Sequence, residues 1–261
     1  MAQTFVIEAI LRRDRLVVAA GLGLVALVAW VWTLAGIGMP MPPDGGMAMS
    51  TAATWSLPHA AMILLMWWVM MVAMMLPSAA PLILLATALY RRKDRDGLAG
   101  LAAGFLAAGY LAVWGGFSFA AAVVQGSLEA MGLLAPSTMA AAAPALAGGL
   151  LLAAGLYQLT PVKQACLRRC RSPVTFLTQY WRPGLAGAFR LGLAHGAYCL
   201  GCCWFLMALL FVGGVMNPIW IGALALYVLA EKLAPRGHLL SRATGLLLVG
   251  WGMITLAQVI R

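Results

Sequence analysis

Long apolar stretches separated by short polar segments recur along the chain from residue 16 to residue 260. Each reaches or approaches the ~20 residues that an α-helix needs to cross ~30 Å of hydrocarbon. The pattern therefore predicts an all-α fold: a polytopic transmembrane helix bundle of about seven spans, forming a single domain over residues 1–261. The expected spans are Leu16–Ile37, His59–Leu85, Leu98–Val124, Pro144–Thr160, Leu185–Val212, Pro218–Leu233 and Ala243–Ile260.

The charged residues fit this interpretation and orient the bundle. Hydrophobic residues make up 64% of the chain and charged residues 9%, whereas a soluble domain carries about a quarter charged residues. The net charge of +10 comes from loop residues, and all of the 17 Lys and Arg except Arg261 fall on one predicted side. The positive-inside rule then places the N-terminus inside and the C-terminus outside, in a bacterial inner membrane. We expect the lipid bilayer, and no nucleic acid, as a partner.

The first span follows three arginines and lacks a convincing small-residue cleavage site, so it is expected to remain as a span and not to be a cleaved signal.

An imidazole and several thiols lie close together in the fifth apolar stretch. On a helix His195, Cys199 and Cys202 fall within roughly a 60° arc, and Cys203 widens it to roughly 100°. Soft ligands on one face suit a thiophilic metal ion, and an ionisable residue inside a span marks a functional site by default. The alternative is that each residue only packs in the core, since Cys is often buried. The spacing of the four residues together favours metal ligation. Four ligands on one regular helix cannot all surround a single ion, so the second span is expected to contribute a ligand.

Two further cysteines lie in the largest inner loop, Pro161–Gly184. Cys166 and Cys170 are four residues apart and share one face of a helix. Neighbouring arginines favour the thiolate form, and a permanent disulfide is not expected on the reducing inner side. The alternatives are two unpaired small hydrophobic residues or a redox pair.

Methionine is concentrated in one part of the chain, because ten of its 16 copies lie between Met39 and Met75. Met66, Met70 and Met74 fall within roughly an 80° arc of the second span. Thioethers are soft ligands that suit Cu(I), although Met also fills gaps in apolar cores. Four more lie in the first outer loop, where there is no core to fill: Met39, Met41, Met47 and Met49.

The second span is expected to contact the fifth. Pro77 removes the helical donor for the carbonyl of Ala73, and in lipid such a group survives only where protein, water or a ligand satisfies it. We therefore expect a kink near Leu76–Pro81 that faces the interior, with the Met face opposed to the thiol face. Glu231, near the inner end of the sixth span, is expected to pair with Lys232, Arg190 or His195, or to be an interfacial charge.

Four strings resemble one known family: MWWVMMVAMMLPSAAP (Met66–Pro81), YQLTPVKQACLRRCRSP (Tyr157–Pro173), HGAYCLGCCWFLM (His195–Met207) and the later GVMNPIW…LAEKLAPRG. The chain resembles the bacterial family of predicted metal-binding integral membrane proteins that is catalogued as a domain of unknown function. The resemblance implies a membrane protein that binds metal. The matching positions include Met66, Met70, Met71, Met74, Met75, Cys166, Cys170, His195, Cys199, Cys202, Cys203 and Glu231.

These observations predict an inner-membrane protein that binds Cu(I) and either transports it or delivers it for cuproenzyme assembly. Outer-loop methionines would collect the ion, the second span would pass it to the thiols of the fifth, and the inner cysteines would receive it. Expected partners are the metal ion and a metallochaperone or membrane partner protein. Zinc is the alternative metal, since a His and three Cys form a recognised tetrahedral set.

Two other functions compete with copper handling. A membrane thiol–disulfide oxidoreductase would exchange mixed disulfides but would not require the methionines. A structural or assembly subunit would merely bury its thiols. The chain contains no Walker loop, glycine-rich nucleotide fingerprint or HExxH motif, so we expect a metal-binding or transport protein in preference to an enzyme.

Overall fold

Helices form the regular structure of the chain in a computed structural model, which describes residues 2–36, 56–93, 98–135 and 137–259. Over this part of the chain the expected all-α fold is confirmed, with one isolated bridge between Leu134 and Ala141. The helices are α1 (Ala2–Leu34), α2 (Leu57–Lys93), α3 (Ala99–Ala130), α4 (Pro144–Leu159), α5 (Pro161–Cys170), α6 (Pro173–Tyr180), α7 (Gly184–Ala208), α8 (Leu210–Gly213), α9 (Pro218–Leu233) and α10 (Gly237–Ala257).

Local sequence signals fix where several helices begin. A proline is the first residue of α4, α5, α6 and α9, a position where its missing N–H costs nothing and its fixed φ suits the helix. The Thr160 side chain accepts a hydrogen bond from the Lys163 N–H at the start of α5. The Asn217 side chain accepts hydrogen bonds from the N–H groups of Ile219 and Trp220 at the start of α9. These caps satisfy donors that the first helical turn leaves free.

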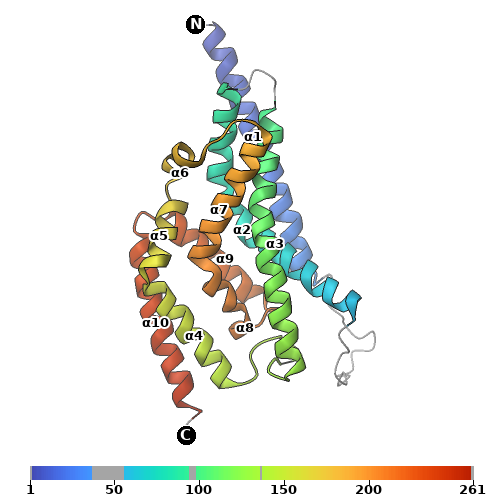
Figure 1. Ribbon diagram of the computed structural model, residues 1–261, viewed down its shortest axis with the longest axis vertical. Helices are drawn as coiled ribbons and strands as arrows, with labels where there is room; N and C mark the ends of the chain where they lie inside the picture. The colour runs from blue at the N-terminus through green and yellow to red at the C-terminus, as the bar shows by residue number, and fades with distance from the viewer. Residues whose placement is uncertain (1, 37–55, 94–97, 136, 260–261) are drawn as a thin grey trace.

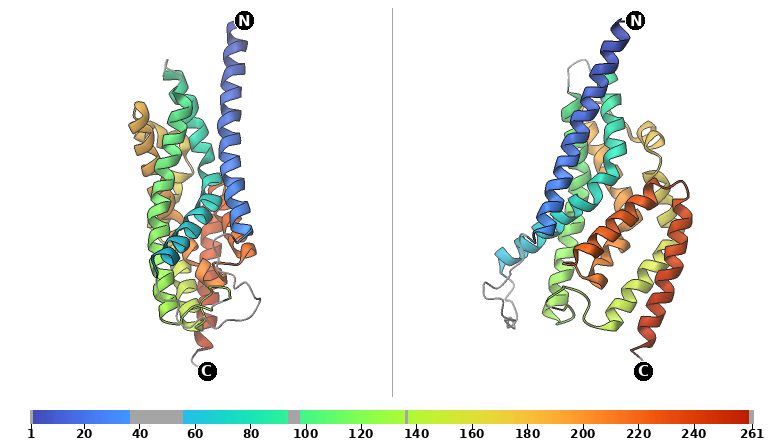
Figure 2. Two further views of the ribbon diagram at one scale, coloured as in Figure 1. Left: turned by 90° about the vertical axis from the view of Figure 1, so that its right-hand side faces the viewer. Right: turned by 180° about the vertical axis from the view of Figure 1, so that it is seen from behind.

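The helices form an elongated bundle, with the start of α1 and the end of α10 at opposite ends of its long axis (Figure 1). Helix α3 packs closely against both α2 and α7, and α1 packs against α2. Helices α4 and α10 form a second close pair (Figures 1 and 2). Helix α9 contacts α2, α7 and α10, so it joins the two groups of helices.

Small residues allow the closest helix contacts. A side chain at Gly192 of α7 would collide with the Leu106 carbonyl of α3, and one at Gly109 of α3 would collide with the Phe189 carbonyl of α7. At Gly155 of α4 a Cβ would lie 2.7 Å from a backbone nitrogen of α10. Glycines at these positions therefore let the helix backbones approach closely.

Among the described residues, five helices are long and apolar enough to cross a membrane: α1 from Leu16, α2, α3, α7 with α8, and α10. Helices α4 and α5 satisfy the same criterion only as a pair bent by 67°, and α9 has 16 residues. Each of the seven expected apolar stretches contains a helix within its described residues, but seven spans and the orientation of the termini remain predictions.

Helix α2 continues through Pro77 and Pro81 and changes direction along its length (Figure 2). The Met75 carbonyl accepts hydrogen bonds from the hydroxyl groups of Ser78 (2.8 Å) and Tyr110 (3.1 Å). Two hydroxyl groups thus contact the α2 backbone two residues before Pro77. Pro81 itself is exposed, so the bent segment does not face the interior along its whole length.

Candidate metal centre

Helix α7 carries the imidazole and three thiols into the core of the bundle. Cys199 and Cys202 are 0% exposed, Cys203 is 1% exposed and His195 is 3% exposed. Gly192 and Gly196 bring this helix against α3, which closes one side of the group. The sequence prediction that these four residues lie in a place without bulk water is therefore consistent with their burial in the described fold.

Cys199 has charged and polar neighbours from two other helices. The Lys232 ammonium of α9 donates a hydrogen bond to the Cys199 sulfur over 2.8 Å, and the Tyr110 hydroxyl of α3 lies 3.0 Å from the same sulfur. Lys232 also donates to the Ser78 hydroxyl of α2 over 2.9 Å. The Cys199 sulfur is thus the centre of a buried polar network that joins α2, α3, α7 and α9.

Cys202 and Cys203 are held by the backbone one turn away. Each thiol donates to the Cys199 carbonyl oxygen over 3.0 Å. The two sulfurs consequently lie less than about 6 Å apart. Electrostatic interactions also link the Cys202 thiol with those of Cys199, Cys203 and, on α5, Cys170.

Helix α5 completes a group of thiols that we call the cysteine cluster: Cys166, Cys170, Cys199, Cys202 and Cys203. Helices α5 and α7 are in contact, and the Cys166 sulfur lies 2.9 Å from the position that a side chain at Gly201 would occupy. Cys166 and Cys170 are half-buried, and all five cysteines are free thiols. The cysteine pair of α5 and the thiols of α7, which are separate features in the sequence, therefore lie close together.

His195 lies one turn before Cys199 among aromatic rings. Its ring stacks on Tyr110, with 5.6 Å between centroids, and meets the Phe176 ring of α6 edge-on at 5.3 Å. Its Nδ1 is buried and has no hydrogen-bond partner. A buried polar atom without a partner is uncommon and calls for an explanation such as a ligand.

In the described ranges, no three His, Cys, Asp or Glu side chains are placed to hold a metal ion together. The cluster thus offers pairs of neighbouring thiols but not a preformed tetrahedral site. Thiolates and thioethers are soft ligands that select Cu(I), and a pair of them is enough for this ion. Chemically, the arrangement suits soft-metal binding at low coordination number.

The methionines of α2 line part of the same core. Met70 and Met74 are 1% and 3% exposed, and Met66 is half-buried against the core. Met62, one turn earlier, is 41% exposed. The predicted methionine face is therefore buried from Met70 inward, and only partly so at its outer end.

The expected direct packing of the second and fifth spans is replaced by packing through α3. Helix α3 lies against both α2 and α7, and these two helices are not among the closely packed pairs of the described residues. Tyr110 of α3 bridges them, because its hydroxyl reaches both the Met75 carbonyl and the Cys199 sulfur. The large aromatic side chain spans a gap that the sequence pattern alone does not reveal.

The partner of Glu231 is none of the three expected residues. Its two oxygens each lie 2.9 Å from the Lys163 ammonium, in an ion pair with both side chains 0% exposed. Lys232, which sequence reasoning treated as a partner for Glu231, contacts Cys199 instead. In the sequence, the adjacent Glu231 and Lys232 inside an apolar run mark this part of α9 as unusual. The pairing of Glu231 with Lys163 depends on how α5 and α9 are placed in the fold.

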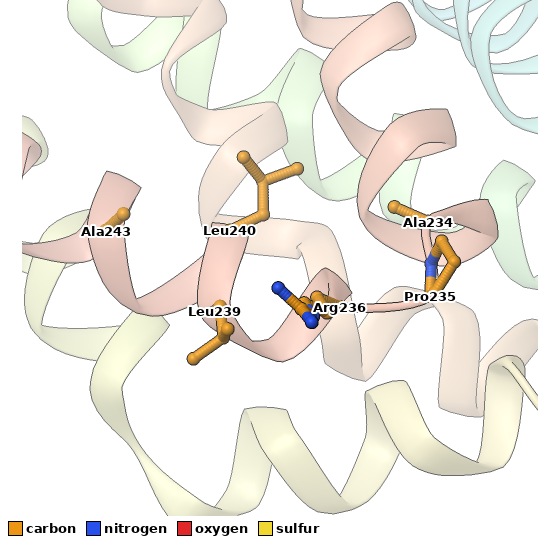
Figure 3. Close-up of a pocket in the computed structure, with 6 residues that line it drawn as sticks. All are labelled: Ala234, Pro235, Arg236, Leu239, Leu240 and Ala243. Atoms are coloured by element: carbon orange, nitrogen blue, oxygen red, sulfur yellow. The ribbon is translucent and has the colours of Figure 1, made fainter.

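Features outside the core take other positions. The outer-loop residues Met39, Met41, Met47 and Met49 lie outside the described residues. The imidazole of His59, near the start of α2, stands 3.9 Å from the Glu129 carboxylate, near the end of α3, and His238 is exposed. An open pocket lies at the turn from α9 to α10, and none of the residues predicted to bind metal lines it (Figure 3). It is lined by Ala234, Pro235, Arg236, Leu239, Leu240 and Ala243.

Comparison with known proteins adds one decisive finding. The model of a family described as PpoB2, copper chaperone, matches residues 64–255. The chain belongs to this copper chaperone family. The four strings that carry the resemblance to metal-binding membrane proteins all lie inside the matched range. No curated protein and no solved structure matches the chain.

Membership of the PpoB2 copper chaperone family supports a copper-related role for the chain. The matched range includes every residue of the cysteine cluster, together with His195, Met66, Met70 and Met74. The copper-binding residues of this chain are not assigned by the family match.

Proposed function

We propose that this copper chaperone is an integral membrane protein that binds Cu(I) in its helical core and delivers it for cuproenzyme assembly. One observation carries the proposal: Cys199, Cys202 and Cys203 of α7 are buried in an apolar interior, and the Cys166 sulfur of α5 lies 2.9 Å from the position that a side chain at Gly201 of α7 would occupy. Thiolates at such a place have few uses besides soft-metal binding and redox exchange. The family match favours the first of these.

The order of ligands along the core supports a route for the ion. Met70 and Met74 are neutral thioethers on α2, and the Tyr110 hydroxyl contacts both the carbonyl of the following residue, Met75, and the Cys199 sulfur. The cysteine cluster then extends to the half-buried Cys166 and Cys170 at the edge of the bundle. Passage from thioethers to thiolates raises affinity along this route, and the half-buried pair is where a metallochaperone or membrane partner protein would take the ion.

Coordination chemistry favours Cu(I) over zinc as the cargo. Structural zinc is almost always four-coordinate and tetrahedral, while the described residues contain no group of three His, Cys, Asp or Glu placed for one ion. Cu(I) is satisfied by fewer soft ligands, which neighbouring pairs in the cysteine cluster supply. His195, with its unpartnered Nδ1, is the nearest nitrogen donor on the same helix face.

The location of the protein is part of the proposal. The apolar helices and the one-sided distribution of Lys and Arg support a bacterial inner membrane, with α5 and α6 on the inner side. The seven apolar stretches would then cross the membrane one after another, and the cysteine cluster would lie in the inner half of the membrane.

Anaerobic titration of the purified full chain with Cu(I), against a chromophoric Cu(I) chelator, tests the proposal. We expect the chain to withdraw copper from the chelator stoichiometrically. A variant with all five cysteines changed to Ser, in the same detergent, is the matched control and should leave the chelator complex intact. Equal copper uptake by the two proteins, or none by either, would contradict the proposal.

A further inference from the structure

Lys232 is a buried cation whose neighbours leave its charge without a carboxylate. Its side chain is 7% exposed, and its ammonium donates to Cys199 and Ser78. The adjacent Glu231 is engaged by Lys163 through both oxygens, and no ion pair joins Lys232 to a carboxylate in the described part of the chain. A cation in an apolar core requires a compensating negative charge. The nearest group able to supply it is the thiolate form of Cys199.

The net charge of the Cys199–Cys202 site depends on the charge of the metal ion that binds there. Two thiolates, Cys199 and Cys202, together with the Lys232 ammonium carry a net charge of one negative unit. One monovalent cation neutralises that charge, whereas a divalent cation on the same pair leaves a positive charge in the core. The repulsion from Lys232 also grows in proportion to the charge of the ion, and it is strong because the surroundings exclude water.

We propose that Lys232 is a specificity-determining residue that makes the Cys199–Cys202 pair selective for soft monovalent metal ions over soft divalent ones. This inference rests on the proposed function and names its substrate class. The contact that carries it is the 2.8 Å hydrogen bond between the Lys232 ammonium and the Cys199 sulfur. The Ser78 hydroxyl accepts a second hydrogen bond from the ammonium without adding charge.

A purely structural role for Lys232 predicts different behaviour. Lys232 ties α9 to α7 and α2 through hydrogen bonds, and losing these ties would weaken the binding of every metal ion alike. If Lys232 acts through its charge, variants that lose the charge change the ratio of monovalent to divalent metal affinity. Variants that keep the charge keep the wild-type ratio. The ratio of Cu(I) to Cd(II) affinity separates the two roles, since both ions are soft and differ in charge.

The experiment compares Cu(I) and Cd(II) binding to the full chain in detergent under anaerobic conditions. Lys232→Met and Lys232→Gln remove the charge, Lys232→Arg keeps it, and Ser78→Ala removes a hydrogen bond without changing charge. We expect the neutral variants to lose Cu(I)-over-Cd(II) preference by on the order of a hundredfold, from the Coulomb repulsion of one extra unit charge a few ångströms away. Lys232→Arg and Ser78→Ala should keep the wild-type ratio.

Each outcome decides between the claims. An unchanged ratio in a folded neutral variant overturns the inference and leaves the proposed function standing, while a wild-type chain that binds no Cu(I) overturns the proposed function itself. If neither neutral variant folds, the wild-type ratio is compared with that of dithiothreitol, a thiol pair without a neighbouring cation. A wild-type preference no greater than that of dithiothreitol would also overturn the inference.

Discussion

Among single residues, Cys202 is a fully buried thiol of the cysteine cluster that shares the Cys199 carbonyl with Cys203. Changing Cys202 to Ser keeps its size but removes a soft ligand. We expect Cu(I) affinity to fall on the order of a hundredfold or more, beyond the effect of losing a residue that only supports a ligand. Chelator competition on purified protein measures the loss.

A matched control for this change introduces the same hydroxyl elsewhere in the core. Ala121 of α3 is 6% exposed and is no member of the cysteine cluster, so Ala121→Ser should leave copper binding at the wild-type level. Both variants should elute as folded, monodisperse protein. Full copper retention by Cys202→Ser would remove Cys202 from the site.

At the same scale, the sequence identifies the soft ligands but not their polar partners. The spacing of His195, Cys199 and Cys202 places them on one helix face, and burial follows from the apolar run around them. The contacts of Tyr110 and Lys232 with Cys199 join residues 89 and 33 positions apart. Such contacts depend on where helices cross, which hydrophobic periodicity does not specify. Lys163, expected in a loop, is buried for the same reason.

At the scale of helices, the contact of α3 with α7 holds the thiol-bearing helix in place. A methyl group at Gly192 would collide with the Leu106 carbonyl, so Gly192→Ala should destabilise the protein by about 1–3 kcal/mol. Gly104→Ala on α3 is the control, because open space surrounds that position and Ala favours a helix by about 0.5–1 kcal/mol. Thermal unfolding in detergent measures both. Equal effects of the two changes would refute the proposed close contact.

The methionine face of α2 gives a second prediction at this scale. Met and Leu are similar in volume, so Met70→Leu combined with Met74→Leu should cost less than about 1.5 kcal/mol per site. The pair should nevertheless slow or weaken Cu(I) loading, because it removes two buried soft ligands. Met62→Leu, at a position 41% exposed, should change neither. Unchanged loading rates in the double variant would reduce the α2 methionines to packing residues.

The pattern of apolar residues predicts where helices occur but not where they end. All seven expected stretches are helical, yet α2 and α3 extend to Lys93 and Ala130, past their predicted ends. Polar residues that end an apolar run do not end a helix when their propensity is helical. The α5 and α6 helices lie inside the predicted inner loop, where Pro161 and Pro173 begin them.

For the whole molecule, the orientation in the membrane makes a direct prediction. Ser137 lies in the connection from α3 to α4 and Ser172 between α5 and α6, and both are exposed. In a background without the native cysteines, Ser137→Cys should react with an impermeant thiol reagent added outside cells, and Ser172→Cys only after the membrane is opened. Reaction of both from outside would contradict the inside placement of α5 and α6.

The central claim for the whole molecule is that its buried sulfur atoms hold Cu(I). X-ray absorption spectroscopy at the copper edge, on anaerobically loaded full-length protein, tests this claim most directly. We expect an edge typical of Cu(I) and a first coordination shell dominated by sulfur, with a low coordination number. A shell made only of nitrogen and oxygen, or copper removed entirely by washing, would contradict it.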